Sequence, residues 1–454
     1  MKIVIAGAGE VGYHLIENLC KENLDIFVID TNAAVLNKLK SQYNINTDHG
    51  NIIDSKYIKK SHLKNTDLFL AITNSDETNM IACKSAKEAG AKKTIARIRQ
   101  VNLDSTKNHF SLESLGIDWV INPVALVADE LFKLVLTPNI VDNHEFSNGT
   151  VNITGYKMTD HSTMVGHSIK DIEKKAYKLF FNIGIVQRKD MTIIPKKDEV
   201  IQLGDVVYFI YQKSDYPNLR RTIGYPTSHS KSKHVFINGG GNMGLQLANR
   251  LEKAHQEVKV IEKRLARSYD IAEKLQKSLV LNFDGTDLKQ LSAEGIDNAD
   301  YFISVTDNEQ VNITSCLIAN EQGVQRTISL IKQPELIPII DQNTPITLGI
   351  SPRILTARYL LRYIQDTHIF SYFSIINSQI EILEMHLEES STCLNIPIKN
   401  LEIPENIIIS VINRNEEFII PDGNSELSVG DIILVIAHRL DRPKAIHFFH
   451  PDSK

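Results

Sequence analysis

Hydrophobic and polar positions follow two different patterns along the chain. In the first pattern, short apolar runs at 3–6, 26–30 and 68–72 are separated by longer stretches with helical spacing. This predicts strands and helices that alternate, as they do in a parallel sheet. In the second pattern, around 186–211, short apolar runs are separated by turn residues. This predicts a small α+β domain that is richer in antiparallel strands.

Both patterns occur twice. The apolar run at 3–6 is followed by GAGEVG, and it recurs at 235–238, followed by GGGNMG. The pair Gly204-Asp205 before a late apolar run recurs as Gly430-Asp431. A duplication over nearly the whole chain is therefore indicated. The predicted fold class is α/β, with two tandem Rossmann-like doubly wound parallel-sheet domains, each followed by a small α+β domain.

Capping and linker signals divide the chain further. Asn122-Pro123 and Ser351-Pro352 each place a capping residue before a first-turn proline, and each opens an apolar-periodic helix. The polar stretch at 225–233 is typical of a linker. The predicted order is a first Rossmann-like nucleotide-binding domain at 1–121, a crossover helix at 122–140, a small α+β domain at 141–224, the linker at 225–233, a second Rossmann-like domain at 234–350, a crossover helix at 351–372 and a second small α+β domain at 373–454.

Composition excludes several classes of function. The 454 residues are 42% hydrophobic, which suits a globular protein of two to four domains. The formal net charge is -5 and no basic run is present, so nucleic acid is not an expected partner. The four cysteines are scattered and predict neither a disulfide framework nor a metal site. No apolar run approaches the roughly 20 residues that span a bilayer, so direct membrane insertion is not expected.

The two GxGxxG motifs are candidate phosphate-binding loops. Each follows an apolar strand and opens a helix, so its glycines would permit a tight turn, a close approach of phosphate and close packing of helix on strand. An alternative is a turn that keeps its glycines for packing alone. The candidate residues are Gly7, Gly9, Glu10, Val11 and Gly12 in the first loop and Gly239, Gly241, Asn242, Met243 and Gly244 in the second.

Acids follow the two loops at the spacing of a ribose-binding carboxylate. Asp30 and Glu262 lie near the roughly 20 residues expected after the first glycine, and they would accept hydrogen bonds from ribose hydroxyls. Because a carboxylate repels a 2′-phosphate, they favour NAD over NADP, but they do not separate NAD from ATP or ADP. Lys263 and Arg264 beside Glu262 weaken this argument in the second half, although a solvated helix start is the plainer interpretation.

Further polar residues are expected at the carboxyl edge of each sheet, where open α/β sheets bind ligands. Thr73 and Asn74 follow the fourth strand, and Thr306 follows its counterpart; each is either a ligand contact or part of a helix cap. Arg97 and Arg99 flank Ile98 on the next strand, so either can reach a phosphate. The matching positions of the second half are Leu330 and Lys332, and the two sites are therefore predicted to differ.

Together, the duplicated GxGxxG motif, the paired acids, the segments TNSDETNM and TDNEQVNI and the repeated Gly-Asp strand domain resemble the TrkA family. Its members are peripheral regulatory subunits of Trk-type potassium uptake systems with two tandem RCK (KTN) units. The resemblance implies binding of NAD(H) and/or ATP/ADP, no catalytic residues, and gating of an integral-membrane potassium transporter. It also implies a homo-oligomeric ring, located in the cytoplasm on the inner face of the plasma membrane through that partner.

Carried over to this sequence, the resemblance implies two nucleotide sites. The first consists of Gly7, Gly9, Gly12, Asp30, Thr73 and Arg97, and the second of Gly239, Gly241, Gly244, Glu262 and Thr306. An acid-glycine segment after the third strand is intact in the second half, where Asp284 is a candidate contact, whereas the first half has Asn-Ile-Ile-Asp at 51–54. The second half in turn lacks a match to Arg97. The ligand of each half therefore stays open.

Two other functions fit parts of the sequence. A GxGxxG motif with an acid is also typical of NAD-dependent oxidoreductases, but these need a second domain with a general acid or base beside the nicotinamide. Here the remaining length holds another Rossmann-like copy and two small domains without an evident constellation of that kind. A nucleotide-sensing regulator of a different ion transporter is the other alternative.

Overall fold

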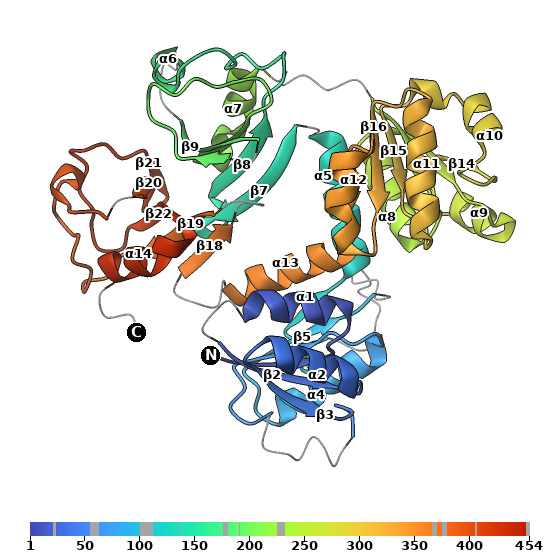
Figure 1. The fold of residues 1–454 in the computed structure, drawn as a ribbon, viewed down its shortest axis with the longest axis horizontal. Coiled ribbons are helices and arrows are strands. Elements are labelled where there is room, and N and C mark those ends of the chain that lie inside the picture. Colours follow the sequence, from blue (N-terminus) through green and yellow to red (C-terminus); the bar gives the residue numbers. More distant parts are fainter. Residues whose placement is uncertain are drawn as a thin grey trace. The chain divides into compact units, whose positions relative to one another are not determined.

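The computed structural model describes residues 1–20, 24–54, 63–99, 112–137, 139–175, 180–189, 191–224, 232–365, 370–374, 379–404 and 406–450 (Figure 1). The chain forms two compact units: unit 1 comprises 1–135 and 232–361, and unit 2 comprises 136–231 and 362–454. Each unit thus combines a part from before the predicted linker, here called the first half, with a part from after it, the second half.

The first half contributes a parallel sheet to unit 1. Within the described residues its strand order is β3-β2-β1-β4-β5-β6, and all neighbouring strands are parallel. The order reverses between β1 and β4, which opens a crevice at their carboxyl ends. The bounds are β1 Lys2–Ala6, α1 Glu10–Leu19, β2 Asp25–Asp30, α2 Ala33–Gln42, β3 Asn46–His49, β4 Leu68–Ala71, α4 Asp76–Glu88, β5 Lys93–Arg97, η2 Glu113–Leu115 and β6 Trp119–Ile121.

The second half repeats this sheet with the order β14-β13-β12-β15-β16-β17 in the described chain. Its bounds are β12 His234–Asn238, α8 Asn242–Lys253, β13 Glu257–Ile261, α9 Leu265–Ala272, β14 Leu279–Leu281, α10 Leu288–Ala293, η5 Ile296–Asn298, β15 Tyr301–Ser304, α11 Glu309–Glu321, β16 Arg326–Leu330, η6 Pro334–Leu336, α12 Ile337–Asn343 and β17 Leu348–Ile350. The central strands β1, β4, β12 and β15 are apolar and buried almost throughout, as expected of parallel strands covered on both faces.

Helix α5 (Pro123–Leu136) begins at the predicted proline, and the Asn122 side chain caps it by accepting from the backbone N–H of Val124 at 3.0 Å. Its apolar face is formed by Val127, Leu131 and Val135, which are buried. These side chains lie in a core cluster with the strands and helix α8 of the second half. A helix of the first half therefore completes the core of the second.

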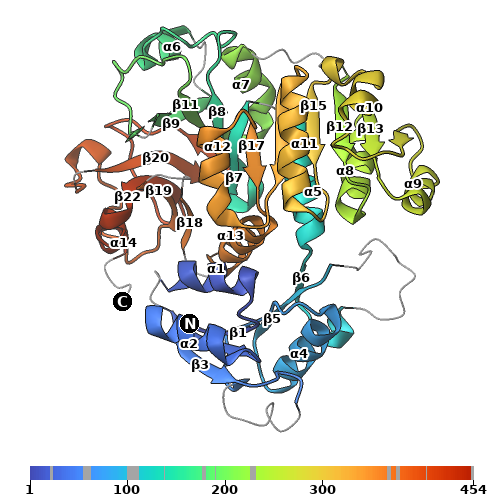
Figure 2. The ribbon, with the colours of Figure 1, turned by 45° about the vertical axis from the view of Figure 1, so that its right-hand side comes forward.

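Helix α13 (Pro352–Gln365) also contacts the other half of unit 1. Arg353 in its first turn pairs with Glu10 of α1. Further along, Tyr359 stacks on Trp119 of β6, with ring centroids 6.1 Å apart. The two halves of unit 1 are consequently joined by both crossover helices, and Figure 2 shows α13 beside α1.

Unit 2 contains two antiparallel sheets, with the orders β10-β9-β11-β8-β7 and β18-β19-β22-β20-β21 among the described strands. One core cluster combines buried residues of both, including Ile153 and Ile210 from the first and Ile382 and Ile436 from the second. The bounds are β7 Ile140–Phe146, η3 Ser147–Gly149, β8 Val151–Lys157, α6 Ile169–Lys175, β9 Phe181–Arg188, β10 Met191–Ile193, β11 Val206–Gln212, η4 Lys213–Asp215, α7 Tyr216–Ile223, β18 Phe370–Ser374, β19 Ile380–His386, η7 Ile398–Asn400, β20 Ile407–Arg414, β21 Glu417–Ile419, β22 Ile432–His438, η8 Arg439–Asp441 and α14 Arg442–Phe449.

The repeated Gly-Asp pair has a structural role in unit 2. Asp205 is 1% exposed and accepts two hydrogen bonds from Arg188, at 2.9 Å from Nε and 2.8 Å from Nη2. Asp431 receives the same pair of bonds from Arg414, at 2.8 and 2.7 Å. A bidentate contact between an arginine and a buried aspartate thus lies directly before β11 and directly before β22.

The predicted fold class is confirmed: both parallel-sheet domains and both small domains with antiparallel sheets are present. The predicted domain boundaries stay predictions, and most of the predicted linker, at 225–231, lies outside the described residues. None of the helices in the described chain is long and apolar enough to cross a membrane. Within the same residues, no group of three or more His, Cys, Asp or Glu side chains is placed to hold a metal ion. Burial raises the pKa of Cys83 and of Cys316 to about 12, which leaves these thiols protonated and inert.

Candidate functional site

The first glycine loop lies between β1 and α1, and its three glycines differ in how much space surrounds them. Gly7 has φ +110°, and a Cβ there would lie 2.8 Å from the backbone nitrogen of Thr73. A Cβ on Gly12 would lie 2.1 Å from the carbonyl oxygen of Gly7. By contrast, a Cβ on Gly9 would meet nothing within 4 Å. Gly7 and Gly12 are thus required for packing, whereas Gly9 leaves open space beside the start of α1.

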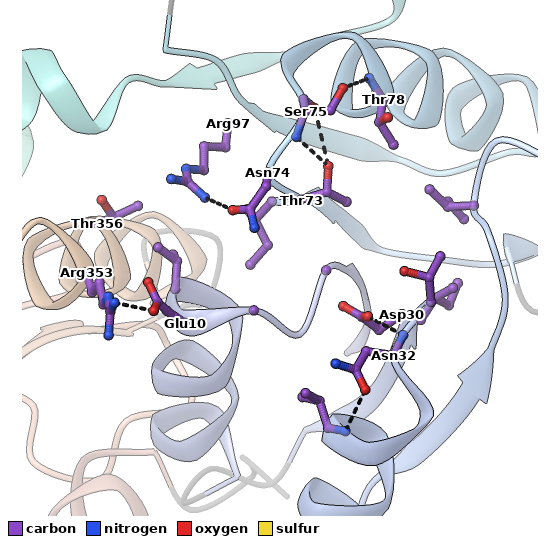
Figure 3. Close-up of a pocket in the computed structure, with 18 of the residues that line it drawn as sticks. Glu10, Asp30, Asn32, Thr73, Asn74, Ser75, Thr78, Arg97, Arg353 and Thr356 are labelled. Carbon is purple, nitrogen blue, oxygen red and sulfur yellow. Dashed lines mark hydrogen bonds and ion pairs between the residues drawn. The ribbon is translucent and has the colours of Figure 1, made fainter. Parts of the chain in front are cut away.

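That open space belongs to a cavity of about 720 Å³ at the carboxyl ends of β1 and β4 (Figure 3). It lies in the crevice that the strand order predicts. Gly12, a predicted site residue, packs behind the loop and is not part of the lining. Eight predicted residues of the first half do line the cavity: Gly7, Gly9, Glu10, Val11, Asp30, Thr73, Asn74 and Arg97.

Asp30 lies at one end of the cavity, after β2. One carboxylate oxygen accepts the backbone N–H of Ala8 at 2.6 Å, and the other accepts that of Asn32 at 2.7 Å. Asn32 in turn caps α2 by accepting the backbone N–H of Ala34 at 3.0 Å. These bonds fix the carboxylate between the glycine loop and α2, and each oxygen keeps a lone pair for a ribose hydroxyl.

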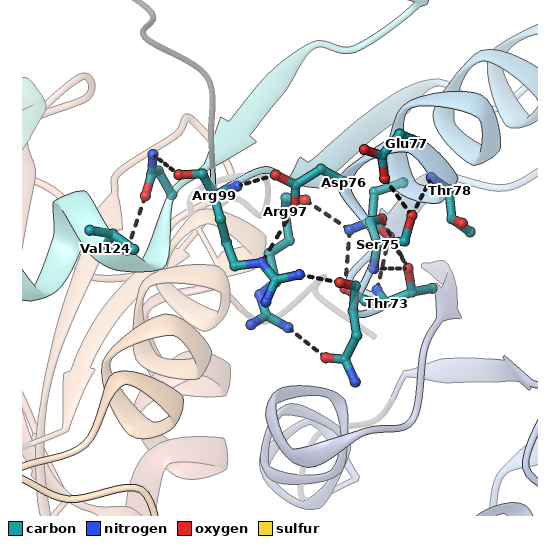
Figure 4. Close-up of polar contacts among 11 residues, drawn as sticks. Thr73, Ser75, Asp76, Glu77, Thr78, Arg97, Arg99 and Val124 are labelled. Atoms are coloured by element: carbon teal, nitrogen blue, oxygen red, sulfur yellow. Dashed lines mark hydrogen bonds and ion pairs between the residues drawn. The ribbon is translucent and has the colours of Figure 1, made fainter. Parts of the chain in front are cut away.

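Thr73 and Asn79 build the turn after β4, and Figure 4 shows Thr73 and Ser75 in this turn. The Thr73 hydroxyl donates to the Asn79 side-chain oxygen at 2.7 Å, and the buried Asn79 amide donates to the carbonyl oxygen of Arg97 at 2.8 Å. Ser75 is the residue that caps α4, by accepting the backbone N–H of Thr78 at 3.1 Å. In this turn the Thr73 side chain is therefore a structural contact, whereas Asn74 faces Arg97, whose Nη1 lies 3.4 Å from its side-chain oxygen.

Four cationic side chains line the cavity, and this group is called here the cationic end: Arg97, Arg99, Lys332 and Arg353. Figure 3 shows Arg97 and Arg353 across the cavity from Asp30. Burial lowers the pKa of Arg97, and the nearby charge of Arg99 lowers it further. Its Nε is buried without a hydrogen-bond partner among the described residues. A desolvated cation next to another cation is stabilised by an anion. The cationic end is therefore suited to phosphate.

Sequence reasoning missed Arg353, Asn32 and Thr356 as lining residues. Asn32 carries a recognisable signal, because an asparagine before a helical stretch next to a ribose-binding acid is a capping residue at the same edge. Arg353 carries none: it belongs to the second half, and no pattern in the sequence places that helix beside the first glycine loop. Arg99 was expected on the strand with Arg97, but it lies beyond the end of β5, where its backbone N–H donates to Asp76 at 2.8 Å.

The second glycine loop repeats the construction of the first. Gly239 has φ +113°, and a Cβ on Gly244 would lie 2.0 Å from the carbonyl oxygen of Gly239. Glu262 accepts the backbone N–H of Gly240 at 3.1 Å and that of Arg264 at 2.8 Å. The Thr306 hydroxyl donates to Asn312 at 2.7 Å, as Thr73 does to Asn79.

The surroundings of the second loop differ from those of the first. Arg267 of α9 lies on the loop: its Nε donates to the carbonyl oxygen of Gly240 at 2.9 Å, and its Nη2 lies 3.4 Å from the side-chain oxygen of Asn242. Asp284 pairs with Lys263 at 2.7 Å, and this hydrogen bond and charge lower the pKa of Asp284. Met243 packs against the core of the second half. Several predicted ligand contacts of the second half thus already have partners within the protein.

The fold and the first cavity define a class of protein. It has two tandem Rossmann-like domains, each followed by a small antiparallel-sheet domain. The cavity of the first Rossmann-like domain is lined by a glycine loop, by the acid Asp30 and by the cationic end. Family comparison agrees with this class. The TrkA-N domain family matches residues 3–123 and 235–352, and the TrkA-C domain family matches 153–224 and 382–449. The chain belongs to the TrkA family of Trk system potassium uptake proteins.

Individual relatives match over nearly their whole length. The Trk system potassium uptake protein TrkA of Halomonas elongata is 30% identical over 443 residues, which cover 96% of this chain and 95% of that protein. The protein of the same name from Haemophilus influenzae is 30% identical over 460 residues, with 100% and 99% covered. Among solved structures, the GsuK channel bound to NAD is similar in fold, with a TM-score of 0.63 and 16% identity over 98% of this chain and 78% of that chain. The GsuK RCK domain is similar with a TM-score of 0.61, 16% identity and coverage of 98% and 94%.

Proposed function

We propose that this chain is a regulatory subunit of a Trk-type potassium uptake system, and that it binds NAD(H) or ATP/ADP in the cavity of the first half. The proposal rests on one observation: a single cavity is lined by the Asp30 carboxylate, by a glycine loop at a helix N-terminus and by the cationic end. A nucleotide with its ribose at Asp30 would place its phosphates on the amides of Glu10 and Val11. NADH, ATP and ADP share this arrangement of ribose and phosphates. The solved GsuK channel bound to NAD, a fold relative, supports the same type of ligand.

Binding without turnover is part of the proposal. The described lining of the cavity contains no histidine, cysteine or tyrosine, and its one lysine, Lys332, donates to the carbonyl oxygen of Asp307 at 2.6 Å. Its two acids are engaged within the protein, Asp30 by two backbone N–H groups and Glu10 by Arg353. A dehydrogenase needs a general acid or base placed beside the nicotinamide. The cavity therefore favours a protein that senses a nucleotide over one that oxidises or reduces a substrate.

Regulation requires that ligands distinguish two states, because a ligand with equal affinity for both shifts neither. The two crossover helices supply a physical route, since each contacts the opposite half of unit 1. We propose that nucleotides alter these contacts, and that an integral-membrane potassium transporter responds to the altered arrangement. The proposal includes a homo-oligomeric ring of these chains on the inner face of the plasma membrane, held there by the transporter.

The test is reconstitution of the full chain with a Trk-type transporter in vesicles. Potassium flux is measured with ATP, ADP, NADH and no nucleotide, and the nucleotides are recovered from the same samples and separated by chromatography. We expect fluxes that differ by about 5- to 150-fold between ligands, the range of ordinary coupling energies, and nucleotides recovered unchanged. Equal flux under all four conditions with confirmed binding would rule out gating, and steady conversion of NADH would favour an oxidoreductase.

A second prediction concerns the ribose end of the cavity. Asp30→Ala should weaken binding of NADH and of ATP to the full chain by about 1 to 3 kcal/mol, because a charge-assisted hydrogen bond to ribose is lost. Titration calorimetry measures both affinities. Asp25→Ala, at the exposed start of the same strand, is the control and should leave them unchanged. Unchanged affinities in Asp30→Ala would mean that the ribose does not bind there.

A further inference from the structure

The cationic end contains an ion pair that joins the two halves of unit 1. The guanidinium of Arg353, in the first turn of α13, pairs with the carboxylate of Glu10, in the first turn of α1 (Figure 3). The Arg353 side chain is 18% exposed, whereas that of Glu10 is 67% exposed. Glu10 directly follows Gly9, the glycine with open space in front of it. A carboxylate therefore stands where the helix N-terminus would receive a phosphate.

A phosphate group that enters the cavity competes with the Glu10 carboxylate for the Arg353 guanidinium. Phosphate and carboxylate both fit the planar fork of an arginine, but a phosphate group carries more negative charge and more acceptor oxygens. It would also repel the Glu10 carboxylate, which lines the same cavity. Glu10 is mostly exposed and can turn to solvent, whereas Arg353 is mostly buried at the edge of the cavity. The group that leaves the pair is accordingly expected to be Glu10.

Two of the other cationic side chains at this end, Arg99 and Lys332, are bound by oxygen atoms outside the lining acids. Arg99 donates to the backbone carbonyl of Asn74 and to the carboxylate of Asp76, and Lys332 donates to the backbone carbonyl of Asp307 at 2.6 Å. Arg353 differs from both, because its described partner is an acid of the cavity itself. It is the cation that a ligand can recruit by displacing a competing charge.

We propose that Arg353 binds the terminal phosphate of a nucleoside di- or triphosphate held in the first half, and that this phosphate takes the guanidinium from Glu10. The inference rests on the proposed nucleotide binding. It adds a contact from the second half that distinguishes ATP and ADP from NADH. A ligand with a terminal phosphate binds Arg353 of α13 and breaks the ion pair between Arg353 and Glu10 of α1. In a dinucleotide the second phosphate is a diester that carries a single negative charge and fewer free oxygens than the terminal phosphate of ADP or ATP, so it leaves the Glu10–Arg353 pair in place.

The decisive experiment compares Arg353→Gln with the unaltered full chain by titration calorimetry, using ATP, ADP, NADH and adenosine. Loss of one charge-assisted contact should lower ATP and ADP affinity about tenfold, with changes of less than about threefold for NADH and adenosine. Arg353→Lys keeps the charge and should retain most of the ATP affinity. Glu10→Gln removes the competitor and should raise ATP affinity severalfold, with little effect on adenosine.

Arg250→Gln is a matched control. Arg250 of α8 pairs with Asp129 of α5 at 3.4 Å, so it also joins the two halves, but it does not line the cavity. Its loss should leave all four affinities unchanged. The proposal is overturned if Arg353→Gln binds ATP as the unaltered chain does, or if it loses ATP and adenosine affinity equally, which would indicate a purely structural role. Absence of nucleotide binding in the unaltered chain would instead overturn the proposed function.

Discussion

Gly12→Ala is expected to abolish nucleotide binding in the first half and to destabilise unit 1 by about 3 kcal/mol. The added Cβ would lie 2.1 Å from the carbonyl oxygen of Gly7, a backbone atom that cannot move without opening the turn between β1 and α1. Overpacking of this kind typically costs about 1 to 3 kcal/mol, and backbone atoms give way least. The helix N-terminus that would receive the phosphates would be displaced by the same movement.

Gly9→Ala separates binding from folding. A Cβ at Gly9 meets no protein atom within 4 Å, so stability should be unchanged, but the methyl group would stand in the space proposed for phosphate and lower affinity about tenfold or more. Chemical unfolding followed by fluorescence of Trp119, the chain's single tryptophan, measures stability, and calorimetry with ATP and NADH measures affinity. Gly241→Ala, with equally open space in the second loop, is the control and should leave the affinity of the first half unchanged. Full ATP affinity in Gly9→Ala would contradict the placement of phosphate on this loop.

Much of the architecture could be predicted because it depends on local patterns. Short apolar runs alternating with helical spacing give parallel strands that are buried on both faces, as β1 and β12 are. The two glycine loops follow from the same logic, because only glycine fits the left-handed turn at Gly7 and the close approach at Gly12. These requirements involve residues that are close in sequence, so each repeat carries the full signal.

The contacts of α5 and α13 with the opposite half of unit 1 could not be predicted from the sequence. Periodicity shows that α5 has an apolar face with Val127 and Leu131, but it does not identify the surface that covers this face. The structure places these side chains in the core of the second half, about a hundred or more residues away in the chain. The same limit explains why Arg353 was missed: a charged residue in the first turn of a helix has no sequence feature that links it to a loop in the other half.

The second glycine loop shows another limit of sequence reasoning. Its motif is as complete as that of the first loop, and Asp284 even restores a segment that the first half lacks. Yet Arg267 occupies the carbonyl side of the loop, and Lys263 holds Asp284. Whether a ligand-binding group is already satisfied by the protein depends on side-chain geometry, which motif spacing does not encode. The prediction that the two sites differ therefore gains a physical basis, although their ligands stay predictions.

Asp205→Ala should destabilise unit 2 by about 3 kcal/mol, the lower end of the cost of removing one partner from a buried ion pair. Asp205 is 1% exposed and binds both Nε and Nη2 of Arg188, whose side chain is 18% exposed, so its removal breaks both contacts and leaves Arg188 with Glu199 and the carbonyl oxygen of Val200. Hydrogen exchange should report the effect as lost protection in β8, β9 and β11, while the fluorescence transition of Trp119 in unit 1 stays unchanged.

Glu199→Ala is the matched control for this pair. Glu199 also contacts Arg188, at 2.9 Å, but its side chain is 28% exposed and Asp205 would remain in place. Its removal should cost less than about 1 kcal/mol, as for other partly exposed pairs. Equal losses of protection in both variants would mean that the repeated aspartate contributes no more than a surface charge. A large loss confined to Asp205→Ala would show that the contact between Asp205 and Arg188 stabilises its sheet independently of any ligand.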